Sequence, residues 1–450
     1  MVGTEAWRNN LSKRRVDEMI SFADRIQTLG TENAFKLGDD IARCEQAGTK
    51  VIRLNLGEPD FDSAENINKV AIENIKSGNT HYTNPQGILP LRESIARQVY
   101  QTRGVRVDPN QIVVTTGGKP SIAYTMMAYV NPGDEVIYPS PGFPIYESWV
   151  TFLGAVPVPL HLEEDKGFRF DAIDLEKLIS PKTKVLILNS PSNPTGGVLS
   201  RTDLEGIAQV VKGKANPNIR IYSDEIYEYI LFDGHQHQSI LSIPGMAEHT
   251  ILASGHSKTY AMTGWRLGYS ILPSAEEAMV FRQLNINIIS CTPPFIQEAG
   301  RAAIDNKENQ KIVQAMVKQF ENRRDMVVEG LNQIEGIHCN KPDGAFYVFP
   351  NISGACETLG AQAAYEQLPG EKKQRTSPST LFQMFALYHH GVATLDRRSF
   401  GNIGSEGKHY LRLSTATDMG SLKEGIRRIE MASKDVEGFH NYIDTGKYLF

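Results

Sequence analysis

Short apolar runs alternate with amphipathic stretches through the middle of the chain. The apolar runs begin at residues 112, 134, 184, 219 and 250 and read IVVTTGG, DEVIYP, KVLILNSP, IRIYSDE and TILASG. Between the first two runs, Ile122, Met126 and Val130 share one face of a predicted helix that starts at about residue 119. Apolar strands separated by amphipathic helices are typical of a parallel sheet covered on both faces. The pattern therefore predicts an α/β fold with a doubly wound, mostly parallel sheet.

The two ends of the chain show a different pattern. Residues 33 to 47 read as an amphipathic helix, and residues 305 to 335 as a long charged helix with an apolar stripe. The second helix is expected to connect the large domain to a smaller α+β domain built from both ends of the chain. We predict four segments: an N-terminal arm (1–30), the first part of the small domain (31–64), the large domain (65–305) and the second part of the small domain (306–450).

Composition and charge exclude several classes of protein. The 450 residues carry 47 Lys and Arg against 52 Asp and Glu, a net charge of −5, so no nucleic-acid partner is expected. The four cysteines have no CxxC spacing, which predicts neither a metal site nor a disulfide framework and fits a reducing, cytoplasmic compartment. No run of about 18 apolar residues occurs, so no membrane span is expected.

One lysine is distinguished by its neighbours. Lys258 lies in ASGHSKTYAMTGWRLGY, where Ser257 and Thr259 flank it and apolar residues enclose all three. Partial desolvation lowers the pKa of a lysine and keeps its neutral, nucleophilic form available, which suits an amine that forms a Schiff base. The alternative is an ordinary exposed lysine in a loop before a strand.

Two charged residues in apolar strands require partners of opposite charge. Asp224 ends the run IRIYSDE, and Arg412 lies in LRLS, where an unpaired charge is costly. Either a charged ligand or a structural ion pair within the protein meets this requirement.

The stretch SKTYAMTGWRLGY resembles the pyridoxal-phosphate lysine motif of the fold type I aminotransferases, in the class I/II branch that contains the aspartate aminotransferases. Further matches extend from about residue 30 to residue 430. The resemblance implies fold type I, pyridoxal 5′-phosphate as the cofactor and Lys258 as the residue that carries it. It also implies a homodimer with shared active sites, in which Tyr82 of HYTNPQG reaches the cofactor phosphate of the other subunit.

The resemblance assigns residues to the cofactor ring. Asp224 pairs with the pyridine nitrogen and keeps it protonated, which makes the ring an electron sink. Asn193 and Tyr227 bind the oxygen O3′, and Phe143 stacks on the ring. From the residues alone, an aromatic at position 143 is more often a core residue, and an asparagine at position 193 can simply cap its turn.

The phosphate contacts follow from the same resemblance. Arg266, eight residues after the lysine, clamps the phosphate as a planar fork. The other phosphate contacts come from a helix start and the lysine loop, at Gly117, Gly118, Lys119 and Ser257. Gly255 departs from the pattern, because many relatives have a phosphate-binding serine three residues before the lysine.

On the substrate side, Gly57 and Asn193 lie beside the α-carboxylate in the resemblance, and Arg412 holds it. The implied reaction is ping-pong transamination, in which Lys258 moves a proton from Cα of the amino acid to C4′ of the cofactor. An alternative is β- or γ-elimination or replacement by the same cofactor chemistry. A pyridoxal-binding regulator without catalysis is a further alternative, but Lys258, Asp224 and Arg412 are all retained.

Two signals conflict on the substrate side chain. Lys119 resembles the lysine that some aspartate-using relatives place near the distal carboxylate. The segment from Thr31 to Phe35 replaces the small hydroxyl residues of those relatives, and Glu32 within it would repel a second carboxylate. We therefore predict that aspartate is not the best donor, and that residues 353 to 390 shape the entrance for a larger or less acidic amino acid.

Overall fold

The computed structural model describes residues 21–446. Most of the predicted N-terminal arm, including its basic cluster at residues 13–15, lies outside the described residues. Of the helices in the described part, none combines the length and apolar composition that a membrane crossing requires. No group of three or more His, Cys, Asp or Glu side chains in residues 21–446 is arranged to hold a metal ion.

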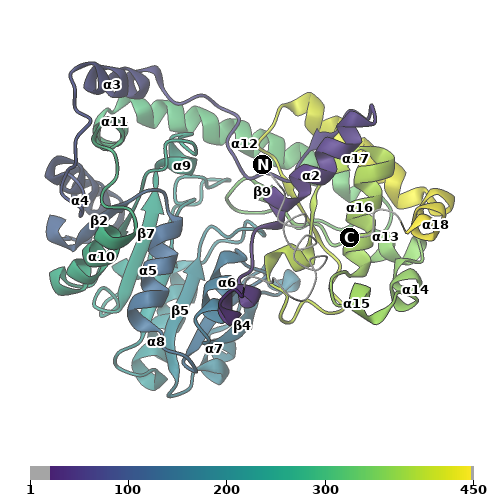
Figure 1. Cartoon of the computed structure of the whole chain (residues 1–450), viewed down its shortest axis with the longest axis horizontal. Helices are drawn as coiled ribbons and strands as arrows, with labels where there is room; N and C mark the ends of the chain where they lie inside the picture. Colours follow the sequence, from purple (N-terminus) through teal and green to yellow (C-terminus); the bar gives the residue numbers. More distant parts are fainter. Residues whose placement is uncertain (1–20, 447–450) are drawn as a thin grey trace.

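The larger part of the fold is built on a seven-stranded sheet (Figure 1). In spatial order its strands are β2 (Ile112–Thr115), β8 (Gly268–Ile271), β7 (Thr250–Gly255), β6 (Arg220–Asp224), β5 (Thr183–Asn189), β3 (Glu135–Ser140) and β4 (Val156–His161). Strand β8 is antiparallel to both neighbours, and the other pairs are parallel. The predicted mostly parallel α/β fold is confirmed.

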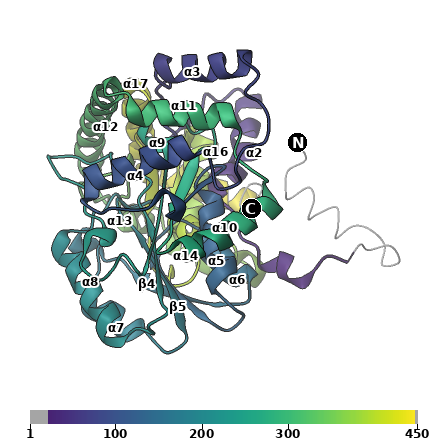
Figure 2. The same cartoon turned by 90° about the vertical axis from the view of Figure 1, so that its left-hand side faces the viewer.

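Helices cover both faces of this sheet (Figure 2). The helices of this larger part are α3 (Glu65–Lys76), α4 (Leu89–Arg103), α5 (Lys119–Tyr129), α6 (Ile145–Phe152), α7 (Ala172–Leu178), α8 (Arg201–Lys214), α9 (His256–Thr259), α10 (Ala275–Ile288) and α11 (Pro294–Asp305). Of these, α3 packs on α11 rather than on the sheet, and α9 is a single turn that follows β7. In β5, Val185 and Ile187 pack with α5, α6 and α10, whereas Leu186 and Leu188 pack with α7 and α8. Because successive side chains of a strand point to opposite faces, a strand apolar at every position is buried on both sides.

The smaller part of the fold combines both ends of the chain. Strands β11 (Leu395–Asp396), β12 (Leu411–Ser414) and β9 (Tyr347–Val348) form one sheet, and β1 (Ile52–Arg53) pairs in parallel with β10 (Val392–Ala393). The surrounding helices are α2 (Asn33–Gln46), α12 (Glu308–Asn332), α13 (Ser353–Thr358), α14 (Ala361–Glu366), α15 (Gly370–Lys373), α16 (Pro378–His390), α17 (Met419–Lys434) and α18 (Val436–Thr445). Short 3₁₀ helices occur in both parts of the fold, and they are η1 (Asp24–Thr28), η2 (Pro109–Gln111), η3 (Glu164–Lys166), η4 (Ile240–Ser242) and η5 (Arg397–Phe400).

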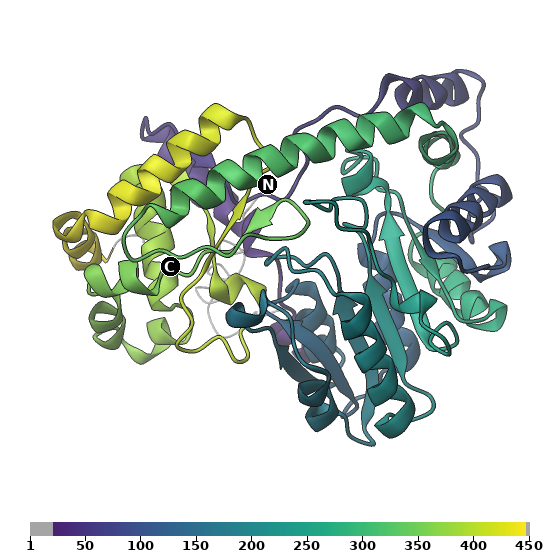
Figure 3. The same cartoon turned by 180° about the vertical axis from the view of Figure 1, so that it is seen from behind.

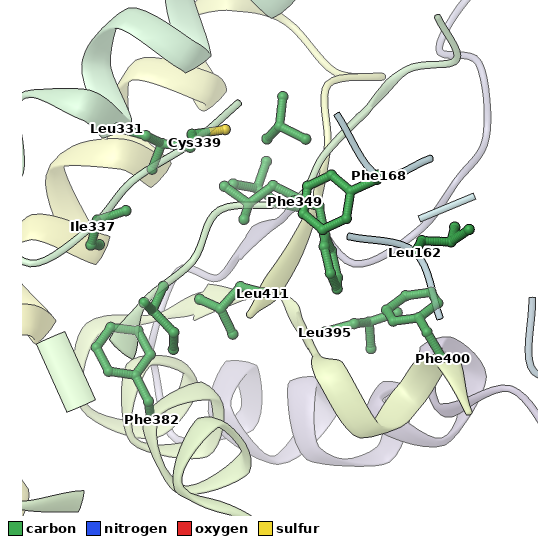
Figure 4. Close-up of a cluster of buried hydrophobic side chains, with 14 of the residues drawn as sticks. Leu162, Phe168, Leu331, Ile337, Cys339, Phe349, Phe382, Leu395, Phe400 and Leu411 are labelled. Atoms are coloured by element: carbon green, nitrogen blue, oxygen red, sulfur yellow. The ribbon is translucent and has the colours of Figure 1, made fainter. Parts of the chain in front are cut away.

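Two features join the parts. Seen from behind, α12 is the long green helix that crosses from one part to the other (Figure 3). A continuous apolar cluster also spans both, and within it Phe168 meets Phe349 edge to face at 5.6 Å (Figure 4). The predicted domain boundaries at residues 65 and 305 stay predictions.

The polar stretch of residues 368–380 is partly helical. Its sequence, LPGEKKQRTSPST, has the composition of a loop, but it contains the one-turn helix α15 and the start of α16. Ser377 begins α16 by accepting a hydrogen bond from the backbone N–H of Thr380 at 3.1 Å. The hydroxyl residues that made the segment look loop-like therefore serve as a helix cap.

Candidate active site

A cavity of about 500 Å³ lies at the carboxyl ends of the parallel strands. Asn189 ends β5, Asp224 ends β6 and Ser254 lies near the end of β7, and all three line it. The smaller part of the fold supplies the opposite wall through α2, β9 and β12. Ligands bind at this position in open α/β sheets, because connecting loops and helix N-termini converge there.

The cavity brings together residues that lie far apart in the sequence. Eleven of the predicted site residues line it, namely Gly57, Gly118, Lys119, Phe143, Asn193, Asp224, Tyr227, Ser257, Lys258, Arg266 and Arg412. Gly117 packs against the guanidinium group of Arg266. Tyr82 is not among the lining residues and is 88% exposed, so its predicted role in a neighbouring subunit stays a prediction. No residue of the 353–390 segment lines the cavity, and the expectation that this segment shapes the entrance stays a prediction.

Lys258 lies in the single turn α9 and points into the cavity. Its Nζ donates to the carbonyl oxygen of Gly57 at 2.6 Å. Burial lowers the pKa of Lys258 to about 8, although the carboxylate of Glu58 acts in the opposite direction. The reading of Lys258 as an exposed loop lysine is therefore wrong, and the neutral form of its amine is more accessible near neutral pH than that of an ordinary lysine.

Asp224 is held in place by hydrogen bonds. Its Oδ2 accepts from the hydroxyl of Tyr146 at 2.7 Å, and its Oδ1 accepts from the backbone N–H of Ile226 at 3.3 Å. Burial raises the pKa of Asp224 to about 6. Within residues 21–446 it forms no salt bridge, so the structural alternative of an arginine partner is absent there, and the carboxylate faces the cavity ready for a cationic ligand group.

Arg412 is a buried cation whose hydrogen-bond acceptors in the protein carry no negative charge. It is buried, and its guanidinium donates to Asn193 Oδ1 at 3.1 Å and to the carbonyl oxygen of Asn55 at 2.5 Å. Its Nε has no hydrogen-bond partner in the described part of the chain, and burial lowers its pKa. Both protein acceptors are neutral, so a carboxylate that enters the cavity would supply the missing negative charge.

Three further residues complete the site, and the sequence alone did not single them out. Tyr146 holds Asp224 as described, and Tyr347 lies 2.8 Å from Tyr227, hydroxyl to hydroxyl. The Tyr347 ring also lies 4.5 Å from the Arg412 guanidinium carbon. Asn189 accepts from the backbone N–H of Asn193 at 2.9 Å. The only sequence signal was position, since each lies in or next to a motif already identified.

The glycines make room for these side chains. A Cβ at Gly57 would overlap the Tyr347 hydroxyl, and one at Gly117 would overlap the Arg266 guanidinium. Gly118 and Lys119 begin α5, whose free backbone N–H groups suit an anion. At Gly255 a Cβ would lie 2.8 Å from the carbonyl oxygen of Leu267, so a side chain at this position would require a backbone shift.

A buried ion network anchors the segment after β6. Arg103, at the end of α4, lies 2.7 Å from Glu225 and 2.6 Å from Glu228, and His237 lies 2.7 Å from Glu225. Burial alone would raise the pKa of Glu225, but Arg103 and His237 lower it to about 2. The network fixes the backbone that carries both Asp224 and Tyr227.

These observations fit the cofactor that the sequence implies. The cavity contains an amine with a lowered pKa, a carboxylate without a cationic partner and a guanidinium without an anionic one. It also contains a helix N-terminus beside Arg266, where an anion is favourable. Pyridoxal phosphate offers a carbonyl for the amine, a ring nitrogen for Asp224 and a phosphate for the helix, and an amino acid offers a carboxylate for Arg412.

Comparison with known proteins gives a consistent result. The sequence model of the family described as aminotransferase class I and II matches residues 49–429. Aromatic-amino-acid aminotransferase 2 of Thermococcus litoralis and an aspartate aminotransferase of Pyrococcus abyssi are each 35% identical, over 92% of this chain and 99% of theirs. The solved aspartate aminotransferase of Rhizobium meliloti superposes with a TM-score of 0.82 at 32% identity, covering 92% of this chain and 99% of that one.

Proposed function

The chain belongs to the aminotransferase class I and II family, and from this premise we propose how its own residues transfer the amino group. It is a pyridoxal-phosphate-dependent aminotransferase that acts between an amino acid and a keto acid. The roles of individual residues, the subunit arrangement and the compartment are the proposed part.

We assign the cofactor contacts as follows. The N-terminus of α5, with Gly117, Gly118 and Lys119, holds the phosphate together with Ser257 and Arg266. Asp224 holds the ring nitrogen, Asn193 and Tyr227 hold O3′, and Phe143 covers the ring. When bound, pyridoxal phosphate supplies an electron-accepting ring that stabilises negative charge at the substrate Cα.

The remaining residues act on the substrate. Arg412 binds the α-carboxylate, and Gly57 leaves space beside it because any side chain there would meet Tyr347. Lys258 takes the proton from Cα, since a pKa of about 8 allows the amine both to accept and to return a proton near neutral pH. One substrate leaves before the next binds, because both use the same Arg412.

The observation that carries this proposal is the convergence of Lys258, Asp224 and Arg412 in one cavity, where the last two lack counter-ions within the described chain. The test is a half-reaction without keto acid, in which the holoenzyme is mixed with one amino acid at a time. About one equivalent of keto acid per chain should form, and added 2-oxoglutarate should then yield glutamate, both measured by mass spectrometry. Release of ammonia in repeated turnovers would instead indicate elimination and refute the proposal.

We also propose a homodimer with shared active sites. Exposed apolar side chains gather on α10, at Met279, Val280, Ile286 and Ile288, and others are Leu56 and, at the start of α4, Leu89. Leu56 itself lines the cavity, and Tyr82 is largely exposed. A second copy that covers these residues would bury apolar area and bring a partner tyrosine towards the phosphate.

A reducing compartment such as the cytoplasm fits the thiols. All four cysteines are free, and Cys44, Cys339 and Cys356 are buried. Burial raises the pKa of the Cys356 thiol to about 12 and keeps it protonated and unreactive.

The lowered pKa of Lys258 predicts how cofactor incorporation depends on pH. Only the neutral amine attacks a carbonyl, so the rate at which cofactor-free protein takes up pyridoxal phosphate covalently should rise about tenfold per pH unit below pH 8 and level off above it. Borohydride reduction at timed intervals, followed by mass spectrometry of the Lys258 peptide, measures this rate. Lys258→Arg protein reports the background at other lysines. A midpoint near the ordinary lysine value of 10.5 would contradict the prediction.

A further inference from the structure

The conflict between Lys119 and Glu32 in the sequence becomes a direct contact in the structure. Glu32, immediately before α2, forms an ion pair with Nζ of Lys119 at the start of α5. The Glu32 side chain is only 17% exposed, and both residues line the cavity. The pair therefore spans the cavity between the smaller and the larger part of the fold.

An apolar surface accompanies this ion pair. Phe35 is 66% exposed, and Nζ of Lys119 lies 5.6 Å from the centre of its ring. Ala34, Phe35, Leu56 and Ile122 all line the cavity. An exposed aromatic ring at a cavity wall offers contact area to an apolar substrate side chain.

The charges of the cavity leave little room for a second carboxylate. The charged side chains that line it are Glu32, Glu58, Lys119, Asp224, Lys258, Arg266 and Arg412. The proposed function assigns the side chains of Asp224, Lys258, Arg266 and Arg412 to the cofactor and to the substrate α-carboxylate. It uses Lys119 only through its backbone N–H at the start of α5, so the Lys119 ammonium group is not assigned to the phosphate. What remains for the side chain is Glu32 and Glu58 against Lys119 alone. A substrate carboxylate would have to displace Glu32 from Lys119 or enter a region with excess negative charge.

Glu32 also acts on the reaction centre. Burial lowers the pKa of Lys258 and of Arg412, and the Glu32 carboxylate works against burial at both residues. The Glu32 carboxylate is therefore close enough to interact electrostatically with Lys258 and Arg412.

We propose that Glu32 is a specificity-determining residue that occupies Lys119, so that the side-chain subsite accepts neutral, apolar amino acids in preference to dicarboxylic ones. The inference rests on the proposed function, because it takes Arg412 as the partner of the α-carboxylate. It reconciles the two sequence signals, because Lys119 is present but Glu32 of the same chain already neutralises its charge.

The test compares kcat/KM for aspartate and phenylalanine, with one fixed keto acid, in wild-type protein and in Glu32→Gln. Wild type should favour phenylalanine, and Glu32→Gln should raise the aspartate-to-phenylalanine ratio at least tenfold, mainly through a lower KM for aspartate. Adding Lys119→Met to Glu32→Gln should remove that gain. Glu58→Gln is the matched control, because Glu58 lines the cavity but bonds to Thr263 rather than Lys119, and it should change the ratio less than threefold.

Ligand binding without turnover gives an independent measurement. Calorimetric Kd values for succinate and 3-phenylpropionate should show the same tenfold change in preference in Glu32→Gln. An unchanged preference would overturn the inference. A wild-type enzyme that uses aspartate tenfold better than phenylalanine would overturn the inference alone, whereas one that converts no amino acid to its keto acid would refute the proposed function as well.

Discussion

Lys258→Ala is expected to lower turnover by at least about 10⁴-fold, the upper range for loss of a positioned general acid or base. The variant loses both the amine that bonds to the cofactor and the group that moves the Cα proton. Cofactor binding should remain measurable, because the α5 N-terminus, Arg266 and Asp224 do not depend on the lysine side chain. Turnover is measured with saturating amino acid and keto acid, and cofactor content by equilibrium dialysis.

The control for this variant is Lys258→Arg. It keeps a positive charge in the cavity but offers no amine, so it should be as inactive as Lys258→Ala. The decisive observation is borohydride reduction of the loaded protein, which should fix cofactor at residue 258 in wild type alone. A cofactor link of the wild-type kind that survives in Lys258→Ala would show that another lysine carries the cofactor.

Asp224→Ala is expected to cost about 3–4 kcal/mol of transition-state stabilisation, or about 10²–10³-fold in kcat, as is typical of losing a preorganised electrostatic partner. The Asp224 carboxylate is buried and faces the cavity, so a cationic ring nitrogen beside it interacts more strongly with it than with water. The measurement is kcat with saturating substrates and full cofactor loading, which separates the electronic effect from lost binding.

Two neighbouring variants make the Asp224 result specific. Asp224→Asn keeps the size of the side chain and removes only its charge, so its kcat should fall as far as that of Asp224→Ala. Tyr146→Phe removes one hydrogen bond and leaves the carboxylate in place, so its effect should be much smaller. A fall of less than about tenfold (1.4 kcal/mol) in both Asp224 variants would exclude Asp224 as the partner of the ring nitrogen.

The large domain was accessible to sequence reasoning because its elements are local. Strand β5 is apolar at each position from Val185 to Leu188, and α5 begins at Lys119 as its pattern predicts. The small domain was harder, because β1, β9, β10 and β11 are two residues long, too short to leave a periodic pattern. Their pairing is defined by partners far away in the chain.

The site residues also differ in how far the sequence reveals them. Residues inside recognisable motifs, such as Lys258 and Asp224, were found because charge in an apolar context is visible in the sequence. Tyr347 and Tyr146 were missed, since tyrosines next to apolar residues look like core residues until the packing is known. The Glu32 and Lys119 side chains gave opposite indications because no pattern along the chain reveals that the two pair with each other.

The pairing of β1 with β10 has a consequence for synthesis on the ribosome. The last strand of the seven-stranded sheet to be synthesised, β8, ends at Ile271, so this sheet can form while the chain is still being made. Strand β1 can pair only after Val392 and Ala393 of β10 have been synthesised. Arg412 is later still, and its guanidinium is bonded to the carbonyl oxygen of Asn55. During translation the nascent chain therefore carries an early segment without its partner and a cavity with one wall missing. The cavity is therefore closed only after β10 and β12 have been made.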